Sequence, residues 1–143
     1  MQIRIGLLAL VLVFSAVAAS AQDNPIVSRM TAFAAAYNAK DAAAIGGFYT
    51  EDGALLPPQS KALIGRDQIA AHYAKAFEGG VEGLDYRILE IRQLGSAAAL
   101  EIGEARVKAG AQTILSRSMH IWTHDNGEWS LSRDMYHVLG VTK

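Results

Sequence analysis

The chain has 143 residues with 13 Lys or Arg, 14 Asp or Glu and no cysteine. This length is typical of one domain with a single core, and a net charge of −1 argues against the basic face of a nucleic-acid-binding protein. Without cysteine the chain has neither a disulfide framework nor a thiolate for metal binding or nucleophilic catalysis.

The first segment is typical of a secretory signal peptide. Arg4 precedes an apolar run over residues 5–18, and the small residues 19–21 follow in the A-x-A pattern of a cleavage site. The run is shorter than the roughly 20 apolar residues that cross a bilayer. We therefore predict cleavage near Ala21, export to the periplasm or the medium with no membrane span left, and one domain over residues 22–143. An uncleaved anchor is the alternative.

Helical spacing follows that segment. An N-cap residue and a proline open a helix over about residues 24–37, where apolar residues recur on one face. Asp41 can cap a second, short helix that two glycines end early. A third apolar stripe lies between Gly65 and the glycine pair at 79–80 and predicts a third helix.

From Leu84 onward the apolar period changes from 3.6 to 2, which indicates strands. Asn126 and Gly127 are the residue pair of a tight hairpin turn between the last two strands. Helices followed by an antiparallel meander predict an α+β fold, in which a curved sheet bends around about three N-terminal helices. The expected strands are residues 84–94, 97–107, 112–124 and 128–138, with a short one at 54–56.

Three segments with a recognisable order and spacing are AFAAAYNAKDAAAIGGFYTEDGALLPP, GRDQIAAHY and MHIWTHDNGEWSLSRDMY. Together they resemble the nuclear transport factor 2-like superfamily, specifically its SnoaL-like and ketosteroid isomerase-like exported proteins. The resemblance extends from about Ile26 to His137. It implies a cone-shaped domain with helices in the concavity of the sheet, a pocket between them and frequently a dimer through the outer side of the sheet.

The same resemblance argues against ketosteroid isomerisation. The family's base aspartate falls on Pro57, its oxyanion tyrosine on Phe33 and its protonated aspartate on Met119. None of these three side chains can exchange a proton. The resemblance thus implies the fold of the enzyme without its acid–base set.

The final hairpin predicts which side chains share a face. With Asn126 and Gly127 in the turn, residue numbers of facing pairs add up to 253, unless a bulge shifts them. Because Met119 corresponds to a position that faces the pocket in the family, we expect the concave face to carry Asp134 near Arg117 and Tyr136. A structural Arg–Asp pair, a ligand-binding pair and a catalytic Asp134 are the three alternatives.

Aromatic residues complete the candidate site, because in a cone fold the core and the pocket lining are one surface. Asp134 is the candidate catalytic residue. The candidate ligand-binding residues are Phe33, Tyr37, Tyr49, Tyr73, Arg117, Met119 and Tyr136.

No cofactor or metal is expected. Metal binding needs three or four converging ligands, and the four histidines form no i, i+4 pair on a helix; they are His72, His120, His124 and His137. The predicted register places His120 and His124 on the outer face. It also places Trp122, Trp129, Leu131 and Met135 there, and so many apolar groups predict a homodimer interface.

The sequence therefore predicts an exported SnoaL-like domain whose apolar pocket binds a small hydrophobic or amphipathic molecule. One alternative is an isomerase-, cyclase- or hydratase-like enzyme that uses Asp134 with Tyr136, Tyr37 or Tyr49. A second alternative is an association domain whose function is oligomerisation.

Overall fold

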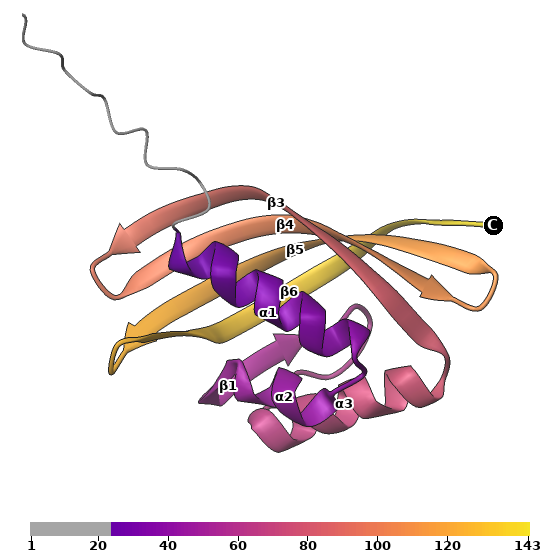
Figure 1. Cartoon of the computed structure of the whole chain (residues 1–143), viewed down its shortest axis with the longest axis horizontal. Coiled ribbons are helices and arrows are strands. Elements are labelled where there is room, and N and C mark those ends of the chain that lie inside the picture. The colour runs from indigo at the N-terminus through magenta and orange to yellow at the C-terminus, as the bar shows by residue number, and fades with distance from the viewer. Residues whose placement is uncertain (1–23) are drawn as a thin grey trace, which may run out of the picture.

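The computed structural model describes residues 24–143, so the predicted signal peptide lies outside the described residues. Within these residues, three helices and six strands follow one another (Figure 1). In chain order they are α1 (Pro25–Asn38), α2 (Ala42–Gly47), β1 (Tyr49–Leu56), β2 (Leu63–Ile64), α3 (Arg66–Glu78), β3 (Val81–Gly95), β4 (Ala98–Ala109), β5 (Gln112–Asp125) and β6 (Glu128–Thr142).

The strands form one sheet in the order β2-β1-β6-β5-β4-β3, which confirms the predicted α+β class. The four long strands make the predicted antiparallel meander. Two features were not predicted: β2, and the parallel pairing of β1 with β6. Figure 1 shows the long strands curving over α1, with α2 and α3 on the same side of the sheet.

The helices begin where the sequence predicts. The Asn24 side chain accepts a hydrogen bond from the backbone N–H of Ile26 at 3.0 Å, and the Asp41 side chain accepts one from Ala44 at 2.9 Å. Each bond satisfies an N–H group that the first helical turn leaves free. Among the described residues, no helix is long and apolar enough to cross a membrane.

The core lies between the helices and the concave face of the sheet. Helix α1 buries Ile26, Met30, Phe33 and Tyr37 along one side, as its spacing predicts. At the end of α1 the Asn38 side chain accepts from the N–H of Leu84 (2.7 Å) and donates to its C=O (3.0 Å), which ties this helix to β3. Met30, Phe33, Tyr37 and Leu84 also line the cavity described below.

A β-bulge in the last hairpin corrects the predicted register. Trp122 faces Leu131 as expected, but Ile121 faces Arg133, so Ser132 has no partner across the ladder. From Arg133 to Val138 the pairing is shifted by one residue, because an extra residue on one strand exchanges the faces of those that follow it, and a second irregularity before Gly140 shifts the end of β6 by one more. His120 therefore faces Asp134, and both side chains are buried, each with 4% of its surface exposed.

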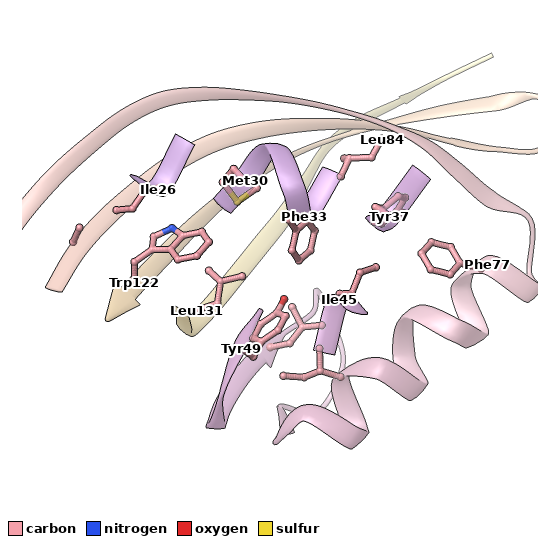
Figure 2. Packing of buried hydrophobic residues seen from close by; sticks show 13 residues of the cluster. Ile26, Met30, Phe33, Tyr37, Ile45, Tyr49, Phe77, Leu84, Trp122 and Leu131 are labelled. Atoms are coloured by element: carbon pink, nitrogen blue, oxygen red, sulfur yellow. The ribbon is translucent and has the colours of Figure 1, made fainter. Parts of the chain in front are cut away.

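The expectation that Trp122 and His120 lie on the outer face is wrong, because the even-numbered residues of β5 face the helices. Trp122 has 0% of its surface exposed, and Figure 2 shows its indole ring among the core side chains. Leu131 is fully buried with it, and Trp129 is half-buried against the same core. Of the four apolar residues that suggested an interface, only Met135 lies on the outer face, and the other three pack in the core.

The outer face carries a different apolar row. Side chains from four adjacent strands lie in register there, and they are Leu56, Met135, Met119 and Ile102. Met119 and Met135 are 41% and 47% exposed. Homodimer formation stays a prediction that sedimentation can test, and a dimer through this face would bury the two methionines in place of Trp122.

Candidate functional site

A cavity of about 690 Å³ lies between the helices and the concave face of the sheet. Its size is in the range of small-molecule sites. Most of its wall is apolar or aromatic, and the aromatic members are Phe33, Tyr37, Tyr73, Tyr86 and Tyr136. The polar members include Ser118, His120 and Asp134, which come from the middle of β5 and β6.

A chain of hydrogen bonds crosses the sheet beside this cavity. It consists of one side chain from each of five neighbouring strands, and we call it the polar row: Tyr49, Asp134, His120, Glu101 and Tyr86. Tyr49 donates to Asp134 Oδ2 at 2.6 Å, and His120 Nε2 lies 3.3 Å from Asp134 Oδ1. His120 Nδ1 contacts Glu101 Oε2, and Tyr86 donates to Glu101 Oε1 at 2.7 Å.

Strand register and burial explain why these groups meet. Glu101 faces His120 and His120 faces Asp134 across adjacent ladders, so alternation places all three on the concave face. Glu101 has 0% of its surface exposed. Buried charges are costly unless they are paired, and here the imidazole bridges both carboxylates while Trp122 Nε1 lies 3.5 Å from Glu101 Oε2.

The electrostatic balance favours a protonated His120. Burial alone lowers the pKa of an imidazole, but the carboxylates of Asp134 and Glu101 outweigh that effect and raise the pKa of His120 from 6.5 to about 10. At neutral pH both ring nitrogens of His120 therefore carry protons, and both N–H groups point at carboxylates. Burial, together with Asp134, also raises the pKa of Tyr49, which keeps its hydroxyl a donor.

A glycine in β4 lets Tyr86 reach this row. Tyr86 starts on β3 one strand beyond Glu101, and its ring crosses Gly103, where a Cβ atom would overlap the ring. The Tyr86 hydroxyl thereby lies 2.8 Å from Ser118 Oγ as well as beside Glu101. Its ring also stacks on that of His120, with centroids 5.9 Å apart and an angle of 14° between the planes.

The structure brings most of the predicted site residues to the cavity. Phe33, Tyr37, Tyr73 and Tyr136 line it, as does Asp134. Tyr49 is fully buried behind Asp134 and contacts that carboxylate without lining the cavity.

Two predicted site residues lie elsewhere. Arg117 points to the outer face, where its Nη2 contacts Glu104 at 2.7 Å, so the expected pair with Asp134 is not formed. Met119 belongs to the exposed outer row. Side chains alternate between the two faces of β5, and the even-numbered residues face the cavity. Because the prediction took Met119 as a pocket residue, it assigned the two faces of β5 the wrong way round.

Sequence reasoning missed Glu101, His120, Tyr86 and Ser118 as members of the site. One feature pointed toward them: an isolated glycine inside a strand often marks the close approach of another group, as Gly103 does for Tyr86. Within residues 24–143, no group of three or more His, Asp or Glu side chains has the arrangement of a metal site.

A comparison with models of protein families identifies the family of this domain. The model of the SnoaL-like domain matches residues 30–131. The chain belongs to the SnoaL-like domain family. The match ends at Leu131, so Asp134 and Tyr136 of this SnoaL-like domain lie just beyond it. No curated protein matches the sequence.

Solved structures show the same fold in this SnoaL-like domain's neighbours. A ketosteroid isomerase-like protein from Erwinia carotovora atroseptica is 23% identical with a TM-score of 0.71, over 81% of this chain and 95% of that one. An NTF-2 like protein of unknown function from Shewanella oneidensis is 25% identical with a TM-score of 0.70, over 78% and 95%. A putative scytalone dehydratase from Novosphingobium aromaticivorans is 11% identical with a TM-score of 0.72, over 82% and 84%.

Replacing Gly103 by Ala should destabilise the domain by about 1–3 kcal/mol, because the new methyl group displaces Tyr86 from Glu101 and Ser118. Gly140→Ala is the matched control: it lies in β6 with no atom within 4 Å of the added Cβ, and should change stability by less than about 0.5 kcal/mol. Urea unfolding measures both. Equal effects of the two substitutions would contradict the packing of Tyr86 over Gly103.

Stability should also depend on pH through His120. Its pKa is raised from 6.5 to about 10 by folding, so the stabilisation is complete below about pH 6.5 and is lost as the pH rises through about 10. The free energy of unfolding should therefore fall between pH 7 and 10 more steeply in the native chain than in His120→Asn. NMR of the imidazole nitrogens offers a check without a variant: a neutral His120 ring at pH 8 would contradict the bridged imidazolium.

Proposed function

We propose that this SnoaL-like domain is exported and binds a small amphipathic molecule in its cavity. The observation that carries the proposal is the cavity of about 690 Å³, which has an aromatic and aliphatic wall with a few polar groups concentrated on β5 and β6. Ligand sites in proteins combine an apolar wall with a small number of placed polar groups in this way. The apolar part of the ligand would contact Phe33 and Tyr73, and its polar end would meet Asp134.

Burial of the polar row supports binding as the leading function. Its members hold one another through the hydrogen bonds described above, so the protein carries a polar surface that is already ordered before a ligand arrives. Ordering side chains on binding costs affinity, and a preformed site avoids that cost. The pattern of residues 1–21 supports export of the domain.

Filling the cavity should block binding. Ala105 lines the cavity and Arg106, the next residue of β4, is exposed on the other face, so Phe at the two positions gives a matched pair. We expect Ala105→Phe to weaken binding of a neutral naphthyl alcohol at least about tenfold and Arg106→Phe to leave it within about twofold. Calorimetric titration measures both, and equal affinities in the two variants would refute the site.

Native mass spectrometry of the protein from its own host complements this test. It would reveal a retained small molecule together with the mass of the mature chain, and thus also whether cleavage occurs near Ala21. A full-length mass would refute cleavage without touching the binding proposal.

A second candidate function is proton abstraction from the bound molecule. The observation that favours it is the position of Asp134, a carboxylate on the cavity wall that His120 and Tyr49 hold in place. A general base placed in this way accelerates proton transfer by about 10² to 10⁴. The isomerase positions Pro57 and Phe33 contribute no acid or base, so Asp134 would act with the hydroxyls of Tyr37 or Tyr136, both on the wall.

Exchange of carbon-bound protons in heavy water tests this candidate without knowledge of the product. With a naphthyl ketone as probe, the native chain should catalyse deuterium incorporation next to the carbonyl, and Asp134→Asn should slow it at least about 100-fold. Asp85→Asn, an exposed residue of β3, should match the native chain. Exchange that persists in Asp134→Asn would exclude Asp134 as the base.

A further inference from the structure

The charges around the cavity do not balance. The buried groups Glu101 and Asp134 are carboxylates, and His120 between them is the one imidazole that pairs with both. Two acidic side chains thus share one basic partner. None of the described residues that line the cavity is a lysine or an arginine, so no fixed cation faces the two acidic groups from the opposite wall.

The positive charge of His120 is not available to a ligand. An imidazolium has two N–H donors, and here Nδ1 is directed at Glu101 and Nε2 at Asp134. A carboxylate ligand would thus meet no free donor on His120 and would approach a buried anion. His72 also lines the cavity, and burial lowers its pKa, which favours its neutral form.

Asp134 by contrast retains capacity as an acceptor. A carboxylate offers about four lone-pair positions, and the described contacts occupy one on each oxygen, from Tyr49 and His120. Asp134 is on the cavity wall, so the remaining positions can accept from a ligand. A charged donor makes the stronger bond to such an acceptor.

The aromatic wall adds a second attraction for a cation. Phe33, Tyr37 and Tyr73 line the cavity, and their rings stand nearly at right angles: Phe33 and Tyr73 at 79° with centroids 6.1 Å apart, Tyr37 and Tyr73 at 82° with centroids 5.9 Å apart. The negative face of an aromatic ring attracts an ammonium group, most strongly where water is excluded.

We propose that the cavity selects organic cations, namely amphipathic amines whose ammonium group contacts Asp134 while their apolar part lies against the aromatic wall. This inference rests on the proposed binding function and narrows it to one substrate class. Desolvation of an ammonium group is costly, and here a hydrogen bond to Asp134 and contact with the aromatic side chains of the wall offset that cost. A carboxylate of the same size would meet no lysine or arginine on the described wall and would approach the Asp134 carboxylate.

Three probes of one shape test the selectivity: naphthylethylamine, naphthylethanol and naphthylacetic acid. At about pH 8 the amine is charged and an ordinary imidazole is neutral. We expect the native chain to bind the amine at least about tenfold more tightly than the alcohol, and the acid at least about tenfold more weakly than the alcohol. Calorimetric titration of the native chain measures the three affinities.

Two matched variants locate the effect. Asp134→Asn removes the carboxylate on the wall and should bring the affinities for amine and alcohol within about twofold of each other. Asp85→Asn removes an equal charge from the exposed side of β3 and should keep the preference of the native chain. If Asp134→Asn fails to fold, the three probes on the native chain still decide the question.

The outcomes separate this inference from the binding function. Binding of the alcohol with equal or tighter binding of the acid than of the amine would overturn the cation selectivity and leave the binding function standing. Failure of all three probes to bind would overturn both. Equal loss of the amine preference in Asp85→Asn and Asp134→Asn would show that overall charge, and not Asp134, attracts the amine, and would also overturn the assignment.

Discussion

The buried imidazole of His120 between the carboxylates of Glu101 and Asp134 is the constraint on which the sheet depends. A buried charge without a partner costs several kcal/mol, so the strands that carry these groups can pair in only one register. A slip of one residue would turn one member of the trio to the outer face and leave the others unpaired. With Tyr49 and Tyr86 at its ends, the polar row fixes five neighbouring strands relative to one another.

The same constraint explains two irregularities of the backbone. Leu131 faces the core, so strict alternation along β6 would place Asp134 on the outer face. The bulge at Ser132 turns Asp134 toward His120 instead. Gly103 leaves room for the Tyr86 ring to cross β4, so that the Tyr86 hydroxyl donates to Glu101 Oε1. Both features weaken an isolated strand, and both are offset by the hydrogen bonds of the groups that they bring together.

The polar groups of the cavity lie at other positions than the family resemblance implied. At the isomerase positions Phe33 and Pro57 the chain is apolar, and a comparison limited to those positions gives an inert pocket. The polar end of the cavity comes instead from β5 and β6, where His120 and Asp134 lie. Since both donors of His120 are directed at carboxylates, this end of the cavity presents an acceptor with negative charge, and that property links the binding proposal to a particular class of ligand.

The sequence by itself determined the helices, their caps, the antiparallel meander, the turn at Asn126 and Gly127, and all the aromatic members of the pocket except Tyr86. These depend on local chemistry: Asn24 and Asp41 cap the turns that follow them, and period and turn residues are visible within a few positions. Only the tertiary structure decided which face of β5 is concave, and hence the places of Trp122, His120 and Arg117. The bulge at Ser132 then decides that Asp134 of β6 shares the face of His120, a relation between distant residues that no local pattern records.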